Sequence, residues 1–212
     1  MRDLSFAFPD GHVVFESINI QFPDRQLIRL HGVSGSGKST LLRLIARLLA
    51  PTSGDIMYRG ISTHEMDPLY WRKEIRYVQQ VPVVPDSSVR SFLVFGLKMM
   101  KKAIPPDDVL YEHMHHLFDE DISLDASARN LSIGQQQRLG LLRAAMTDPD
   151  VLLFDEPTSA LDGAAERQVE EWILNMHVNE GRNILVATHR DLLRDTDCIG
   201  YSIEQASIRR EP

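Results

Sequence analysis

Apolar and polar residues alternate in two stretches near the amino end of the chain, residues 3–8 and 13–22. Alternation with a period of two is typical of strands that bury one face. The sequence Pro-Asp-Gly at 9–11 lies between the two stretches and favours an antiparallel pair. Two later runs, 151–154 and 184–187, are apolar throughout, as expected of parallel strands buried on both faces.

Apolar residues at helical spacing predict helices between these strands. Ser88 is placed to cap a helix that ends before Pro105, and Asp107 is placed to start a second one. A third helix is expected over 131–146, where Asp148 and Pro149 stop it. The core-facing stripe of a fourth helix consists of Val169, Trp172, Ile173 and Met176.

Together these elements predict an α/β fold with a mostly parallel sheet, an N-terminal antiparallel β subdomain and a small helical insert. We expect a single domain over residues 1–212. Its α/β core comprises 1–80 and 131–212, and the insert lies at approximately 81–130.

Composition narrows the class of protein. Hydrophobic residues make up 43% and charged residues 25% of the chain, as in ordinary globular proteins. The net charge of −7 argues against a dedicated nucleic-acid surface. No apolar run reaches the roughly 18 residues that span a bilayer, and the N-terminus lacks the apolar centre of a secretory signal. The single cysteine, Cys198, fits a reducing compartment.

The most informative segment follows the apolar stretch 27–30 and precedes a predicted helix at 41–46. Its pattern, G-x-x-x-x-G-K-[ST], predicts a loop whose backbone N–H groups surround phosphate oxygens at the start of a helix. Lys38 is placed to reach the terminal phosphates, and the Ser39 hydroxyl is placed to bind Mg²⁺. This context is typical of a P-loop NTPase core. The residues expected to contact the nucleotide here are Gly32, Val33, Ser34, Gly35, Ser36, Gly37, Lys38, Ser39 and Thr40.

Two carboxylates, Asp155 and Glu156, follow the buried run 151–154 directly. Ligands of open α/β sheets bind at the carboxyl ends of the strands. We therefore expect Asp155 to hold the metal ion, and Glu156 to accept a proton from a water molecule aimed at the γ-phosphorus.

A second glycine-containing string, Leu-Ser-Ile-Gly-Gln at 131–135, leads into the third helix. Its free N–H groups are suited to an anion. An ordinary capped helix, with Ser132 at its start, explains the pattern equally well.

Six ordered motifs make the chain resemble the nucleotide-binding subunit of an ATP-binding cassette (ABC) transporter over nearly its whole length. The family's Walker A motif falls on Gly32–Ser39, its signature on Leu131–Gln135 with Ile133 in place of a glycine, its Walker B motif on Val151–Asp155, its D-loop on Ser159–Asp162, its switch histidine on His189 and its Q-loop glutamine on Gln80.

The resemblance implies roles for these residues. Catalytic roles fall on Glu156, His189, Lys38 and Gln80, and metal-binding roles on Ser39, Gln80 and Asp155. The resemblance adds Phe8, Ser132, Gly134, Gln135 and Asp162 to the residues that contact the nucleotide. Phe8, or failing it Phe6, occupies the place where the family stacks an aromatic ring on adenine.

The implied cofactors and partners are ATP, Mg²⁺, a second copy of the chain and separate transmembrane permease subunits. ATP held by one copy is closed over by Ser132, Gly134 and Gln135 of the other, giving a head-to-tail homodimer. The permease would dock near Gln80 and residues 81–118 and would place the chain on the cytoplasmic face of the membrane. The apolar residues expected to be exposed for docking are among Val83, Val84, Phe92 and Phe95.

Three other classes are less consistent with the sequence. A non-transport ABC ATPase acting on nucleic acid or large assemblies usually carries coiled coils or two cassettes, and the chain has neither. A small-molecule kinase shares the phosphate loop but does not explain residues 131–135 or the D-loop. A binding-only regulatory cassette is disfavoured by intact Lys38, Asp155, Glu156 and His189.

Overall fold

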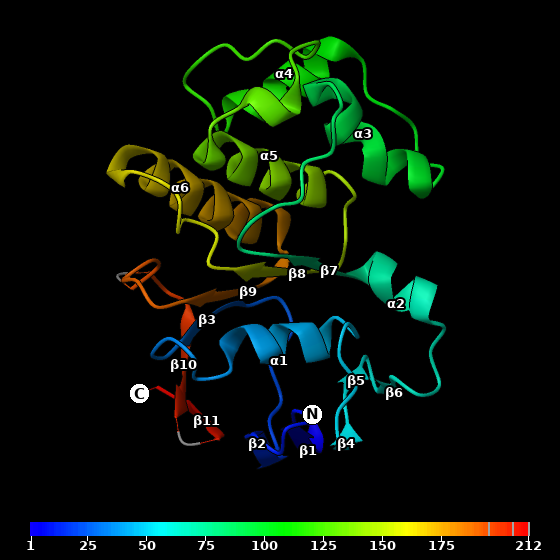
Figure 1. Ribbon diagram of the computed structural model, residues 1–212, viewed down its shortest axis with the longest axis vertical. Coiled ribbons are helices and arrows are strands. Elements are labelled where there is room, and N and C mark those ends of the chain that lie inside the picture. Colours follow the sequence, from blue (N-terminus) through cyan, green and yellow to red (C-terminus); the bar gives the residue numbers. More distant parts are fainter. Residues whose placement is uncertain (195, 205, 212) are drawn as a thin grey trace.

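The computed structural model describes residues 1–194, 196–204 and 206–211. A six-stranded sheet crosses the middle of the molecule, with helices on both faces (Figure 1). Its strands are β3 (Leu27–His31), β7 (Ile75–Val78), β8 (Val151–Asp155), β9 (Asn183–Thr188), β10 (Ile199–Glu204) and β11 (Ser207–Arg210).

The strand order is β11-β10-β3-β9-β8-β7, and every neighbouring pair is parallel except β10 and β11. In the pairing of β3 with β9, His31 lies opposite Thr188, and in that of β8 with β9, Asp155 lies opposite Ala187. The carboxyl ends of these three strands therefore meet at one edge of the sheet, and this confirms the predicted mostly parallel α/β core.

A separate antiparallel sheet forms the N-terminal subdomain, as predicted. It has the order β2-β1-β4, built from β1 (Arg2–Ala7), β2 (Val13–Ile18) and β4 (Ser53–Asp55). A small hairpin, β5 (Met57–Tyr58) and β6 (Ile61–Ser62), follows.

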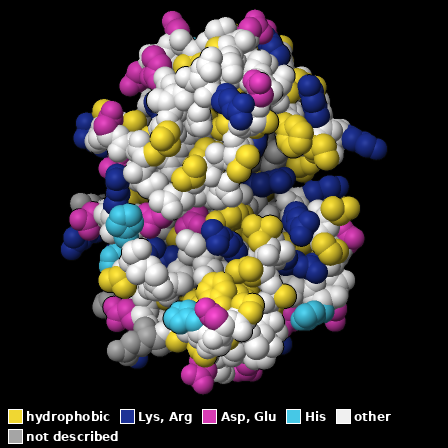
Figure 2. All heavy atoms as spheres, viewed as in Figure 1, with side chains coloured by type: hydrophobic (Ala, Val, Ile, Leu, Met, Phe, Trp, Pro, Cys, Tyr) yellow, Lys and Arg dark blue, Asp and Glu magenta, His cyan; other side chains and the backbone are white. Residues whose placement is uncertain are grey.

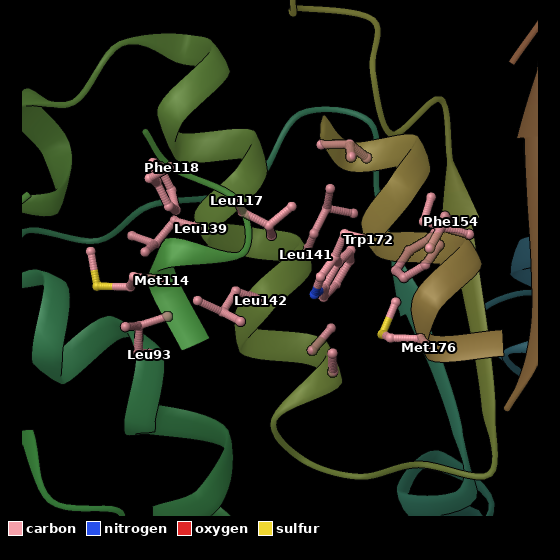
Figure 3. Packing of buried hydrophobic residues seen from close by; sticks show 14 of the residues in the cluster. Leu93, Met114, Leu117, Phe118, Leu139, Leu141, Leu142, Phe154, Trp172 and Met176 are labelled. Atoms are coloured by element: carbon pink, nitrogen blue, oxygen red, sulfur yellow. The ribbon is translucent and has the colours of Figure 1, made fainter. Parts of the chain in front are cut away.

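Two apolar cores lie on opposite faces of the main sheet. One packs α1 (Lys38–Ile45) and Trp71 of α2 (Pro68–Glu74) against the sheet and the N-terminal strands. The other packs α3 (Val89–Met99), α4 (Asp107–His115), α5 (Ile133–Ala145) and α6 (Gly163–Glu180) over the opposite face. In Figure 3, side chains of α5 lie between those of α3 and α4 and those of β8 and α6.

The helix α3 begins at the cap that the sequence predicts. The Ser88 side chain accepts a hydrogen bond from the Ser91 N–H, and this bond caps α3. The predicted exposure of Phe92 and Val84 is wrong. Phe92 is 1% exposed because Arg143 of α5 covers its ring, and Val84 is half-buried against the same core. Phe95, one turn further along α3, is 56% exposed, as expected.

Candidate active site

The loop after β3 has the geometry that the glycine pattern predicts. Gly35 and Gly37 have φ of +82° and +104°, a left-handed conformation that residues with a Cβ rarely adopt. A Cβ on Gly32 would lie 2.7 Å from the Ser36 Oγ and 2.9 Å from the Ile203 carbonyl oxygen. The loop can therefore close tightly only with glycine at these positions.

Lys38, the first residue of α1, is buried beneath this loop. Its Nζ donates hydrogen bonds to the carbonyl oxygens of Gly32 at 2.6 Å and Val33 at 3.2 Å, and lies 4.0 Å from the Glu156 Oε1. Burial lowers the pKa of Lys38, although the carboxylates of Glu156 and Asp155 act in the opposite direction. A buried ammonium held mostly by carbonyl oxygens is suited to a polyanionic ligand, which would offset its desolvation.

The Ser36 hydroxyl is the second sign that the loop is built for a ligand. Its Oγ is buried and has no hydrogen-bond partner among the described residues. Buried polar atoms without a partner are rare in native proteins. A phosphate oxygen in the loop would supply the missing partner.

Ser39 and Asp155 meet at the end of β8. The Ser39 hydroxyl donates to the Asp155 Oδ1 at 2.8 Å, and the Tyr77 hydroxyl donates to the Asp155 Oδ2 at 2.7 Å. The Arg43 Nε in turn donates to the Tyr77 oxygen at 3.3 Å. Burial, together with the hydrogen bond to Asp155, raises the pKa of Tyr77 to about 12, so the phenol is a neutral donor at physiological pH. The hydroxyl and carboxylate oxygens of Ser39 and Asp155 are the kinds of ligand that Mg²⁺ prefers.

Sequence analysis did not predict the contact between Tyr77 and Asp155. Tyr77 lies on β7, which pairs with β8, and its register partner is Leu153. The signal was its position near the carboxyl end of a strand, three residues before Gln80. The contact with Asp155 depends on pairing between two distant segments, and the pattern of residues around Tyr77 does not reveal which strand is its neighbour.

Glu156 and His189, which the sequence places at the same sheet edge, contact each other. The His189 Nδ1 lies 2.8 Å from the Glu156 Oε1, and the Glu156 side chain is largely buried. Glu156 itself has a φ of +49°, which is uncommon for a residue with a Cβ. Left-handed backbone at a buried carboxylate is typical of functional sites.

Gln137 ties the surrounding loops together, and sequence analysis gave it no role. Its buried amide nitrogen donates to the carbonyl oxygens of Gln80 at 3.0 Å and Glu156 at 2.9 Å. Its amide oxygen accepts from the Ala160 N–H at 3.2 Å. Gln137 therefore holds Gln80, two residues after β7, together with Glu156 after β8 and the predicted D-loop.

The start of α5 forms a capping box. The Ser132 Oγ accepts a hydrogen bond from the Gln135 N–H at 3.1 Å, and the Gln135 Oε1 accepts one from the Ser132 N–H at 2.8 Å. Gln135 also donates to Glu120, and this bond lowers the pKa of that carboxyl. Ser132 is exposed, and Ile133 is more than half exposed. The amino-terminal end of α5 is thus capped by residues of the same chain, and its first residues are accessible to solvent.

Three further site predictions have mixed support. Phe6 is buried in the core, whereas Phe8 is 39% exposed with the His12 ring stacked 6.3 Å away, so of the two only Phe8 is accessible. Gln80 is exposed, and its side chain makes no hydrogen bond within the described residues. Asp162 is the N-cap of α6, and the hydrogen bonds that it accepts from the Ala165 and Ala164 N–H groups lower its pKa.

Comparisons with known proteins decide the family. Residues 15–159 match the family model described as "ABC transporter". The chain belongs to the ABC transporter family. The predicted assignment to ABC ATPases is confirmed, and with it the ATPase class of the chain.

Two curated relatives illustrate the match to this ABC chain. A phosphate import ATP-binding protein, PstB of Pyrobaculum aerophilum, is 36% identical over 201 residues, which cover 89% of this chain and 79% of PstB. Protein STAR1 of Oryza sativa subsp. japonica is 33% identical over 180 residues, which cover 84% of this chain. The matched region spans 51% of STAR1, so the chain corresponds to about half of that protein.

Solved structures confirm the fold. The dimeric structure of a bacterial ABC transporter cassette superposes with a TM-score of 0.87 at 23% identity, covering 99% of this chain and 96% of the other. A bacterial Atm1-family ABC exporter with ATP bound superposes with a TM-score of 0.86 at 20% identity, covering 98% of this chain and 37% of the exporter. Across the described residues, every helix of this ABC chain falls short of what a bilayer span requires in length and apolarity.

Proposed function

We propose that this ABC chain binds Mg·ATP at the edge of the sheet where β3, β8 and β9 end, and that its hydrolysis drives transport through separate membrane subunits. The observation that carries the proposal is the convergence of Lys38, Ser39, Asp155, Glu156 and His189 at that edge.

The nucleotide's phosphates would lie in the loop 32–37, where the backbone N–H groups, the start of α1 and the Lys38 ammonium all favour negative charge. The orphaned Ser36 hydroxyl would gain its partner there. The exposed Phe8 ring would stack on adenine, and Thr40, buried in the first turn of α1, would support the loop.

Ser39 and Asp155 would hold the Mg²⁺ ion, with Gln80 approaching as a further ligand when its loop closes. The ion supplies charge neutralisation of the phosphate oxygens. Glu156 accepts the proton of the attacking water, and His189, in contact with Glu156, donates a hydrogen bond toward the γ-phosphate.

The signature residues Ser132, Gly134 and Gln135 would complete the site of a second copy of the chain. Ser132 is exposed and Gly134 and Gln135 are half-buried at the start of α5, where the positive end of the helix dipole favours an anion. A Cβ on Gly134 would lie 3.1 Å from the Ala160 carbonyl oxygen, so the signature helix packs tightly on the predicted D-loop, which ends at Asp162. Both elements would reach the partner's nucleotide together in a head-to-tail homodimer.

Exposed apolar residues beside α3 support a docking face for a membrane subunit. Val83 and Phe95 are more than half exposed, as predicted, and Met99 is also exposed. Figure 2 shows hydrophobic side chains interspersed with basic ones along the side of the molecule where α2 and α3 lie. A docked subunit would hold the chain at the cytoplasmic face of the membrane.

Two arginines indicate the chemistry of the docking partner. Burial lowers the pKa of Arg76 and of Arg143, and the positive charge of Arg76 lowers that of Arg143 further. Arg143 stacks over the Phe92 ring with its Cζ 4.1 Å from the centroid, and the Arg76 Nη2 has only the Met100 sulfur at 3.4 Å. The Arg76 Nε is buried and has no hydrogen-bond partner among the described residues. An acidic side chain on an amphipathic helix of the membrane subunit would complement both.

The alternative, an ABC ATPase acting on nucleic acid or a large assembly, has less support. The net charge of −7 disfavours a nucleic-acid partner. Where the name of a relative reported above states a function, that function is transport.

Replacing Glu156 with glutamine tests the proposed chemistry. Glu156→Gln should bind ATP as tightly as wild type and hydrolyse it at least about 100-fold more slowly, because glutamine cannot accept the proton. Steady-state ATPase assays and fluorescent-nucleotide titrations measure the two effects. Glu112→Gln, on an exposed position of α4, is the matched control and should behave as wild type. Hydrolysis by Glu156→Gln at the wild-type rate would refute the role of Glu156, and a wild-type chain that does not bind ATP would refute the proposal itself.

A further inference from the structure

The carboxylate of Asp155 is held on both of its oxygens. Ser39 donates to Oδ1 at 2.8 Å and Tyr77 donates to Oδ2 at 2.7 Å. Asp155 is 3% exposed, so water has little access to either oxygen. With two donors in fixed places, the carboxylate cannot rotate without losing a hydrogen bond in a buried site, where such losses are costly.

We propose that Tyr77 is a positioning residue for the metal site: its hydroxyl fixes the orientation in which Asp155 meets the Mg²⁺ that accompanies ATP. This inference rests on the proposed function. Ser39 alone cannot fix the carboxylate, because one hydrogen bond leaves the group free to turn about that contact. Partners behind a ligating carboxylate orient it, and their loss typically weakens metal binding by 10- to 100-fold.

The placement of Tyr77 fits this role. β7 runs parallel to β8 with Val78 opposite Phe154, so Tyr77 reaches Asp155 from the neighbouring strand, while Ser39 reaches it from α1. Arg43, an exposed residue near the carboxyl end of α1, donates to the Tyr77 oxygen at 3.3 Å. The Tyr77 side chain extends from β7, and its hydroxyl accepts a hydrogen bond from Arg43 of α1 and donates its own proton to Asp155.

The same chain provides a matched comparison that lies outside the site. The Tyr58 hydroxyl donates to the Asp150 Oδ2 at 2.5 Å, and both groups are partly buried. Asp150 comes just before β8 begins, whereas Asp155 is its last residue, so the two tyrosine–aspartate pairs lie at opposite ends of one strand. Loss of either hydroxyl removes one partly buried hydrogen bond to an aspartate, but only Tyr77 faces a residue assigned to the metal.

The test compares Tyr77→Phe with Tyr58→Phe in the full chain. Affinity for a fluorescent ATP analogue is measured in EDTA and then at increasing free Mg²⁺. We expect Tyr77→Phe to bind the nucleotide as wild type does in EDTA and to require about ten-fold more Mg²⁺ for the tight complex. In ATPase assays the KM for free Mg²⁺ should rise by a similar factor, with kcat at saturating Mg²⁺ within about two-fold of wild type. Tyr58→Phe should leave the Mg²⁺ dependence unchanged.

A double-variant cycle separates positioning from general destabilisation. In an Asp155→Asn background, Tyr77→Phe should cause no further loss of Mg²⁺ affinity, because its effect passes through the carboxylate. Tyr77→Leu, which also lacks the hydroxyl, should reproduce the Mg²⁺ shift. Equal Mg²⁺ dependence in wild type, Tyr77→Phe and Tyr58→Phe would overturn the inference, and so would an additive loss in the Asp155→Asn background. Failure of the wild-type chain to bind ATP would instead overturn the proposed function.

Discussion

Lys38 is a single residue that carries a buried positive charge, with a carboxylate oxygen of Glu156 4.0 Å from its Nζ. The ammonium is buried, and its hydrogen-bond partners are two backbone carbonyls of the loop. Burial is the largest influence on this group and lowers its pKa. In the absence of phosphates, the protonated form of Lys38 is therefore less favourable in the folded chain than in the unfolded chain.

This lowered pKa predicts how stability depends on pH in the absence of nucleotide. Between the folded pKa and the unfolded value of about 10.4, the unfolded chain binds more protons at Lys38 than the folded chain does. The penalty of burying the charge is complete below that window and is relieved as the pH rises through it. The free energy of unfolding of wild type, relative to Lys38→Met, should therefore increase from about pH 8 to pH 10. Urea unfolding of both chains at the two pH values measures this difference. A difference that stays constant or reverses would contradict the lowered pKa.

The elements differ in how well the sequence predicts them, and α3 shows why. Its helical spacing and the Ser88 cap are local features, and both are confirmed. Phe92 and Phe95 lie three residues apart, so the pattern alone places both near one face of the helix. The structure separates them, because α5 places Arg143 over Phe92 and leaves Phe95 in solvent. Burial within a predicted helix thus depends on neighbours that the local sequence does not specify.

These two phenylalanines give a paired prediction. Phe92→Ala should reduce the free energy of unfolding by about 3–5 kcal/mol, because it opens a cavity in the core. Phe95→Ala should change it by less than about 0.5 kcal/mol, because the ring is already largely in solvent. Chemical denaturation of the two variants measures both values.

The same pair tests the docking face. In a complex purified with its membrane subunit, Phe95→Ala should weaken the hold on that subunit although the chain remains as stable as wild type. Equal destabilisation by the two substitutions would contradict the burial of Phe92. Unchanged retention of the membrane subunit by Phe95→Ala would argue against a docking role for the exposed face of α3.

Other elements escaped sequence analysis for related reasons. In α2, only Trp71 is buried, and Leu69 and Tyr70 are exposed, so seven residues give no helical stripe. The phosphate loop, by contrast, was fully predictable because its chemistry depends on consecutive residues. The bond between Tyr77 and Asp155 was not, since 78 positions separate the two residues and only the order of the strands brings them together.

At the scale of the whole molecule, the proposed function divides the nucleotide site into two different half-sites. The phosphate loop, Asp155 and Glu156 would form one of them at the sheet edge. The start of α5 would form the other, where Ser132 is exposed and is hydrogen-bonded to the half-buried Gln135. Two copies arranged head to tail would complete both half-sites twice, and the γ-phosphate would be the shared ligand. In a single copy, the signature residues 132–135 would have no phosphate to contact.

The association state of Glu156→Gln with and without Mg·ATP tests this central claim most directly. Sedimentation velocity should show a monomer without nucleotide and a dimer that retains two ATP molecules when Mg·ATP is added, because hydrolysis no longer removes the bridging charge. Adding Lys38→Ala to Glu156→Gln should abolish the dimer by weakening nucleotide binding. A chain that stays monomeric at saturating Mg·ATP, or that dimerises equally well without nucleotide, would contradict the account.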